Sequence, residues 1–186
     1  MCQWVFPKLS MKMFIYILLA FFSGSTCCSA QTRLSPGRIT AKRGTFIINK
    51  HDKRSFETHS KIVIYSENNK YNNGLPRPRT DNAIPINPKD IHENIEDVKP
   101  IVYKVLNGKL DALRQAHEEM FILINFKTIG EVADIVFSLN ENTVITLEEI
   151  EEIDLKLRTN IKVTFTGKAY LQHEATAGKL IPEIVF

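Results

Sequence analysis

The sequence predicts an α+β fold, in which an antiparallel sheet is packed on one face by two or three helices. Short runs of β-branched and aromatic residues alternate with period two, which is typical of strands. Two other segments place apolar residues at helical spacing. The chain has 186 residues, of which 44% are hydrophobic and 24% charged. A chain of this size and composition can bury its own core.

Residues 1–30 are predicted to be a signal peptide. The apolar run "FIYILLAFF", residues 14–22, follows Lys12 and is far shorter than the ~20 residues that cross a bilayer. Its length suits the hydrophobic region of a cleavable leader. Cys28-Ser29-Ala30 has the small-x-small pattern that signal peptidase cuts, so the mature chain is expected to begin at Gln31. The translation start is Met1 or Met11, and the protein is expected in the periplasm or outside the cell.

The three cysteines, Cys2, Cys27 and Cys28, all precede the predicted cleavage site. The mature chain therefore has no cysteine for a disulfide. The alternative is a lipoprotein anchored through Cys27 or Cys28. A lipobox has an aliphatic residue three positions before its cysteine, where this chain has Gly24 and Ser25. A lipid anchor is therefore disfavoured, and no transmembrane span is expected in the mature chain.

The charge of the mature chain is unevenly distributed. Residues 31–80 contain 11 Lys and Arg against 3 Asp and Glu, whereas residues 81–186 contain 11 against 18. Packing of the two parts against each other is the favoured interpretation, and a basic arm that meets an acidic partner or a membrane is the alternative. The net charge of +3 does not indicate a nucleic-acid partner.

Residues 31–67 are predicted to form a basic region with a hairpin. Its strands are "TFIINK" (45–50) and "KIVIYSE" (61–67), after a lead-in without regular structure at 31–45. Residues 68–89 hold four of the eight prolines and are predicted to be an extended connector.

Residues 90–186 are predicted to be the α+β domain. Apolar spacing from Ile91 onward predicts a helix over 99–107, with Pro100 in its first turn and Gly108 at its end. A second short helix is expected within 109–120. The strand at 120–126 has apolar residues on both faces, which predicts burial on both. The strand at 132–139 is its antiparallel partner across the turn "KTIG".

A capped helix and two strands complete the predicted domain. Thr146 and Glu149 have capping-box spacing, and the apolar stripe that follows predicts a helix over 146–158. Ile161, Val163 and Phe165 alternate as a further strand. "KLIPEIVF" is expected to form a final edge strand, because Pro182 cannot donate to a ladder.

No catalytic, cofactor-binding or metal-binding residue is predicted. The carboxylates of "EEIEE", residues 148–152, lie away from the apolar stripe, which favours a solvated helix face over acid–base chemistry or Ca²⁺ binding. No local signature of a Ser–His–acid triad occurs. Zinc-ligand spacing is absent among five histidines, listed here in order: His51, His59, His92, His117 and His173.

Residues 120–166 resemble the C-terminal half of TonB-type domains. Gly130 and Val132 match the Gly-x-Val at the end of that family's first turn, and Phe137 matches an aromatic position in its second strand. The family's Tyr-Pro signature before the first strand is absent. With its Ala30-Gln31 cleavage site, the whole chain resembles small exported proteins of unknown function from Bacteroides-type bacteria. This resemblance implies a cell-envelope location.

The favoured function is therefore a non-enzymatic binding or accessory module of the cell envelope, with a protein partner. The alternative is a small secreted hydrolase whose site is assembled only in the fold. A secreted inhibitor or toxin-like effector is a third class, for which the sequence has no positive feature.

Overall fold

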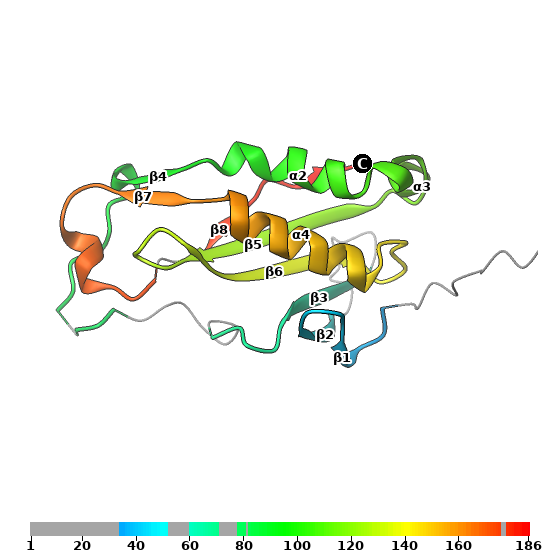
Figure 1. Cartoon of the computed structure of the whole chain (residues 1–186), viewed down its shortest axis with the longest axis horizontal. Helices are drawn as coiled ribbons and strands as arrows, with labels where there is room; N and C mark the ends of the chain where they lie inside the picture. The colour runs from blue at the N-terminus through cyan, green and yellow to red at the C-terminus, as the bar shows by residue number, and fades with distance from the viewer. Residues whose placement is uncertain (1–33, 52–59, 71–77, 81, 176–177) are drawn as a thin grey trace, which may run out of the picture. The chain divides into compact units, whose positions relative to one another are not determined.

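The predicted α+β class is confirmed by an antiparallel sheet with helices on one face (Figure 1). The computed structural model describes residues 34–51, 60–70, 78–80, 82–175 and 178–186. The predicted leader, with Cys27, Cys28 and the cleavage site at Gln31, lies outside the described residues, as does His59. The described residues from 34 onward belong to one compact unit.

The main sheet is antiparallel throughout and has the strand order β1-β2-β3-β6-β5-β8, with β9 also paired to β5. Its strands, in chain order, are β1 (Gly37–Thr40), β2 (Thr45–His51), β3 (Lys61–Ser66), β5 (Glu119–Phe126), β6 (Val132–Asn140), β8 (Lys179–Leu180) and β9 (Ile184–Val185). The predicted hairpin is confirmed, since β2 and β3 pair from Phe46 opposite Ser66 to His51 opposite Lys61.

The lead-in at 31–45 was predicted to lack regular structure, and this is wrong for β1. The backbone N–H of Ala41 donates to the carbonyl of Gly44 at 2.8 Å, and this turn folds Gly37–Thr40 back along β2. An edge strand of four residues is too short to show a clear alternating pattern in the sequence. It forms because the neighbouring strand supplies its hydrogen bonds.

A second, two-stranded sheet joins β4 (Ile91–Glu93) to β7 (Val163–Phe165). The helix predicted from the apolar spacing covers only 99–107, and no strand is predicted for residues 91–93. The strand predicted at 161–165 is present as β7, but it lies outside the main sheet. The connector ends in a single 3₁₀ turn, Pro88–Asp90, capped by the Asn87 side chain.

Helices α2 (Val98–Val105) and α4 (Leu147–Asn160) pack side by side on one face of the sheet, with α3 (Leu110–Gln115) after α2 (Figure 1). The predicted capping box is confirmed: Glu149 N–H donates to Thr146 Oγ1, and Glu149 Oε2 accepts the Thr146 N–H at 2.8 Å. Lys109 lies in the 3₁₀ turn after α2, and its Nζ is 2.9 Å from the Glu149 carboxylate. This contact ties the end of α2 to the start of α4.

The core lies between the helices and one face of the sheet. Buried rows from adjacent strands meet there, since Ile122 lies opposite Phe137 and Ile124 opposite Ile135. The α4 stripe of Leu147, Ile150, Ile153 and Leu157 covers them. The prediction that residues 120–126 are buried on both faces is wrong in part. Phe121 and Leu123 are only half-buried, because the helices cover one face.

The two oppositely charged regions pack together, as the favoured interpretation of their charge expected. Lys50 pairs with Glu141 at 2.9 Å, and Lys61 with Glu119 at 2.7 Å, so that each pair joins the basic region to the acidic one. The backbone N–H of Lys70 also donates to Asp134 at 3.1 Å.

The turn between β5 and β6 is held against β7 by Gly130. Its φ is +95°, and its carbonyl accepts the N–H of Val163 at 3.1 Å. A Cβ at this position would lie 2.5 Å from the Val163 carbonyl oxygen. Both the backbone conformation and the close approach therefore require glycine, which gives a physical reason for the Gly-x-Val pattern.

A buried polar cluster lies at the other end of the same hairpin. Glu118 is 1% exposed and accepts the backbone N–H of Asn140 at 2.9 Å. Lys61, also buried, donates to the Asn140 side chain at 2.8 Å as well as pairing with Glu119. Burial raises the pKa of Glu118, and the Asn140 hydrogen bond and the Lys61 charge offset this only in part.

Replacing Gly130 with alanine should lower the free energy of unfolding by about 2–4 kcal/mol, because the backbone conformation and the Val163 carbonyl both oppose a side chain. Urea denaturation of the full chain measures this. Gly108→Ala is the matched control, since a Cβ there meets nothing within 4 Å. Equal stabilities for the two variants would contradict the proposed role of Gly130.

The Glu118→Gln variant should remove part of the pH dependence of stability. A carboxyl with a raised folded-state pKa binds its proton more tightly in the folded chain than in the unfolded chain. Its stabilising contribution is therefore present at low pH and is lost as the pH rises through the raised pKa. Urea denaturation between about pH 4 and pH 8 should show a smaller decline for Glu118→Gln than for the wild type. Parallel curves would refute this, and exposed Glu96→Gln is the control.

Candidate functional site

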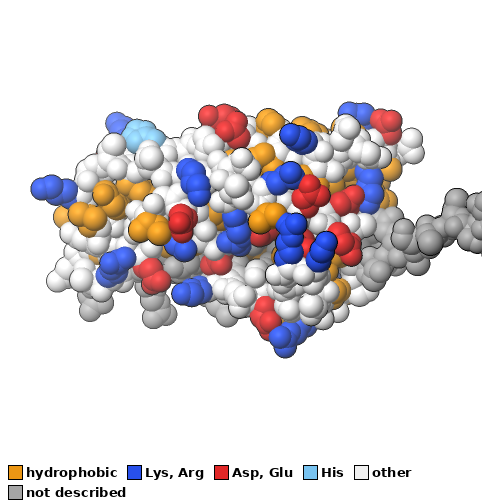
Figure 2. All heavy atoms as spheres, in the orientation of Figure 1, with side chains coloured by type: hydrophobic (Ala, Val, Ile, Leu, Met, Phe, Trp, Pro, Cys, Tyr) orange, Lys and Arg blue, Asp and Glu red, His pale blue; other side chains and the backbone are white. Residues whose placement is uncertain are grey.

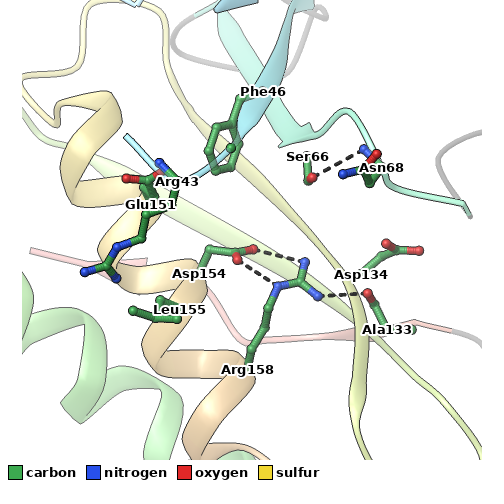
Figure 3. Close-up of a pocket in the computed structure, with 11 residues that line it drawn as sticks. Arg43, Phe46, Ser66, Asn68, Ala133, Asp134, Glu151, Asp154, Leu155 and Arg158 are labelled. Atoms are coloured by element: carbon green, nitrogen blue, oxygen red, sulfur yellow. Dashed lines mark hydrogen bonds and ion pairs between the residues drawn. The ribbon is translucent and has the colours of Figure 1, made fainter. Parts of the chain in front are cut away.

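A cleft of about 360 Å³ opens where α4 lies above the β2–β3–β6 part of the sheet (Figure 3). We call it the α4 cleft. Acidic, basic and apolar side chains line it together. The lining includes Arg43, Ser66, Asn68, Ala133, Asp134, Glu151, Asp154 and Arg158. Phe46 and Leu155 add apolar surface to its walls.

Arg158 fixes one wall of the α4 cleft. Its guanidinium contacts both carboxylate oxygens of Asp154, at 2.7 and 3.2 Å, one helical turn earlier. It also donates to the backbone carbonyl of Ala133 at 2.9 Å, which ties α4 to β6. A two-pronged arginine–carboxylate contact is geometrically specific, so this wall is positioned before any ligand arrives.

Glu151 joins α4 to the β1–β2 turn at another point of the α4 cleft. The sequence predicted that residues 148–152 form a solvated helix face, and this is wrong for Glu151, which is buried. Its carboxylate accepts the backbone N–H of Arg43 in the β1–β2 turn. The turn packs onto α4 at this point, so a residue that faces away from the helix stripe is covered by another part of the chain. Glu148 and Glu152 are exposed, as predicted.

A second cavity of about 370 Å³ adjoins the α4 cleft and shares Asn68, Ala133 and Asp134 with it. We call it the cationic hollow, because it is lined by Lys70, Arg79 and Lys127. Its carboxylates are Asp134, which accepts the Lys70 N–H, and Glu174, which is exposed. The two cavities form one open surface on which hydrogen-bond donors and acceptors are interspersed with apolar groups.

The hydrolase alternative depends on a cleft that joins a histidine to a serine and a carboxylate. No histidine lines either cavity among the described residues. His173 Nε2 contacts the Ile84 carbonyl at 2.9 Å, and His92 Nε2 lies 3.4 Å from Thr166 Oγ1, so neither ring meets a serine or a carboxylate in these contacts. In the parts of the chain that the structure describes, no three His, Cys, Asp or Glu side chains gather as a metal site would require.

The residues of the α4 cleft come from four separate segments, which is why the sequence did not single them out. Ser66 ends β3 and Asn68 follows it, Asp134 lies in β6, Glu151 and Arg158 lie in α4, and Arg43 lies in the β1–β2 turn. The one local signal was Asp154 and Arg158, whose i,i+4 spacing on a helix predicts contact.

Comparison with known proteins shows a shared fold. No family model and no curated protein matches the sequence. Among solved structures, a DUF5043 family protein from Bacteroides uniformis matches with a TM-score of 0.59, over 83% of this chain and 85% of that one. At 13% identity the similarity is one of fold. It agrees with the expected resemblance to uncharacterised Bacteroides-type proteins, while the TonB-type resemblance stays a prediction. Among the described residues, no helix is both long and apolar enough to span a membrane.

Proposed function

We propose that the protein is an exported, non-enzymatic binding module of the cell envelope, and that it holds its partner at the α4 cleft and the cationic hollow. The observation that carries the proposal is the continuity of these two cavities, which share Asn68, Ala133 and Asp134. Their volumes lie in the range of known ligand clefts, and two adjoining cavities can receive neighbouring side chains of one partner segment.

The walls of this surface support recognition because they are ordered in advance. Arg158 is held by Asp154 and by Ala133, and Glu151 is held by the β1–β2 turn. A surface that loses little conformational freedom on binding retains more of its interaction energy as affinity. The leader at 1–30 and the TonB-type resemblance of residues 120–166 support the envelope location and the protein partner.

The C-terminal edge of the sheet is less suited to a partner than the cleft. β8 and β9 have two residues each, and the carbonyl of Val185 already accepts the Tyr103 hydroxyl at 2.8 Å. Ile181 and Ile184 are buried in the core, so deleting residues 180–186 would disturb the fold together with any edge pairing. A point substitution in the cleft separates binding from folding more cleanly.

The Asn68→Trp variant should lose its partner, because residue 68 is exposed and lines both cavities. Full-length wild type and variant are used to capture proteins from an envelope extract of the encoding organism. We expect about tenfold less partner on the variant, as when a bulky group blocks the centre of an interface. Asn107→Trp is the matched control, since it places the same side chain on an exposed residue of another segment. Equal capture by all three proteins, or no specific capture by the wild type, would refute the proposed site.

Export has its own test, which does not depend on binding. Protein isolated from the envelope fraction should begin at Gln31 when its N-terminus is sequenced. A start at Cys27 or Cys28 would identify a lipoprotein instead. An intact N-terminus at Met1 or Met11 would rule out the leader.

A further inference from the structure

A third cavity, of about 480 Å³, lies beside the cationic hollow and shares Thr128 and Ile129 with it. We call it the aromatic hollow. It is bounded by the β5–β6 turn, by β7 and by the 3₁₀ turn Ala169–Gln172, from which come Ile129, Gly130, Val163, Phe165, Tyr170 and Leu171. The cavity therefore combines two parts of the chain that are distant in the sequence, the turn at 128–130 and residues 163–171.

Large apolar side chains are exposed to solvent in and beside the aromatic hollow. Ile129 is 73% exposed and Leu171 is 60% exposed. Ile84, 61% exposed, belongs to a neighbouring segment, since its N–H donates to the Gln172 side chain at 2.7 Å. These are three of the six large apolar side chains that are prominently exposed in the part of the chain that the structure describes. Figure 2 shows apolar side chains gathered at this end of the molecule, bordered by basic and some acidic ones. A clustered apolar patch with a polar border is typical of an interaction site.

The aromatic hollow is ordered without a ligand. The rings of Phe165 and Tyr170 stack with their centroids 5.3 Å apart, and the Gly130–Val163 hydrogen bond fixes the turn opposite. Thr128 binds the segment after the 3₁₀ turn twice, through its N–H to the Glu174 carbonyl and through its hydroxyl to the His173 carbonyl. An apolar side chain could therefore enter a preformed pocket, as the anchor residues of protein interfaces do.

The charges beside the aromatic hollow favour an acidic group next to that apolar anchor. Lys70, Arg79 and Lys127 line the adjoining cationic hollow, and all three are exposed. Lys127 pairs with Glu131 at 3.1 Å, but a pair this exposed to solvent stabilises the chain only weakly and can be exchanged for a ligand carboxylate. Asp134 and Glu174 are the carboxylates of the cationic hollow. Against the three cations they leave one positive charge in excess, and Glu131 balances that charge until a ligand carboxylate replaces it on Lys127, which suits a peptide with a few acidic residues better than a polyanion.

From these contacts we infer that the two hollows together bind an acidic segment of a partner protein, with one large apolar side chain in the aromatic hollow and its neighbouring carboxylates on Lys127 and Arg79. This inference rests on the proposed function as a binding module and adds the chemistry of the partner. Ile129 lies at the junction of the two hollows, where the apolar anchor meets the charged part of the segment.

Selection of random linear peptides displayed on phage, with the full chain as the target, tests this inference. The selected peptides should combine a large apolar residue with neighbouring Asp or Glu. A synthetic peptide of the selected sequence should bind about tenfold more weakly to Ile129→Asp and to the double variant Arg79→Glu/Lys127→Glu. Added salt should weaken its binding, since its carboxylates face exposed cations.

The controls carry the same changes elsewhere on the surface. Leu180→Asp places an acid on another exposed apolar residue, and Lys104→Glu reverses another exposed cation. Both should bind the selected peptide like the wild type. Circular dichroism identifies any variant that has lost its fold. If Ile129→Asp has lost it, Ile129→Ser replaces it and should also bind the peptide more weakly, whereas Ile129→Leu should bind it like the wild type.

Several outcomes would overturn the inference. These are the selection of basic peptides, the absence of any selected peptide, or binding that the hollow variants leave unchanged. Binding to phosphatidylglycerol vesicles in place of peptides would assign the surface to a membrane. The selection needs neither export nor a native partner, so its failure is distinguishable from failure of the proposed function.

Discussion

The pairing of β5 with β6 is the interaction on which the other elements depend. These two strands are neighbours in the sheet, with β3 added to the outer side of β6 and the C-terminal strands added to the outer side of β5. Their buried rows, in which Ile122 faces Phe137 and Ile124 faces Ile135, form the surface that α4 and α2 cover. Without this hairpin, neither the basic N-terminal strands nor the helices would have an apolar surface on which to pack.

Each end of the β5–β6 hairpin is held by a specific hydrogen bond to the backbone. At one end, Gly130 allows the turn to approach Val163, so that the small β4–β7 sheet is joined to the main one. At the other end, Glu118 accepts the N–H of Asn140 from a buried position. A buried carboxyl is costly unless it is hydrogen-bonded or protonated, so this end fixes the strand register while making stability sensitive to pH.

The three cavities follow from the same geometry. The α4 cleft lies between α4 and the β2–β3–β6 part of the sheet. The cationic hollow lies beside the β5–β6 turn, and the aromatic hollow lies between that turn and β7. Asn68, Ala133 and Asp134 connect the first pair, while Thr128 and Ile129 connect the second. The surface thus passes from mixed charge to positive charge to apolar character, and this order is the basis of the proposed acidic partner segment with an apolar anchor.

The sequence by itself determined the features that depend on local periodicity: the fold class, the hairpin of β2 and β3, the β5–β6 pair and the capping box of Thr146 and Glu149. These depend on side-chain alternation, helical spacing and one cap, all of which act within a few residues. Only the tertiary structure decided that β1 and β4 are strands, that β7 pairs outside the main sheet, and that Glu151 is buried. Each of these depends on contact with a segment distant in the chain, such as Arg43 against Glu151, which is 108 residues away. The proposed binding surface belongs to this second group, because its cavities collect residues whose proximity is created by strand pairing and helix packing.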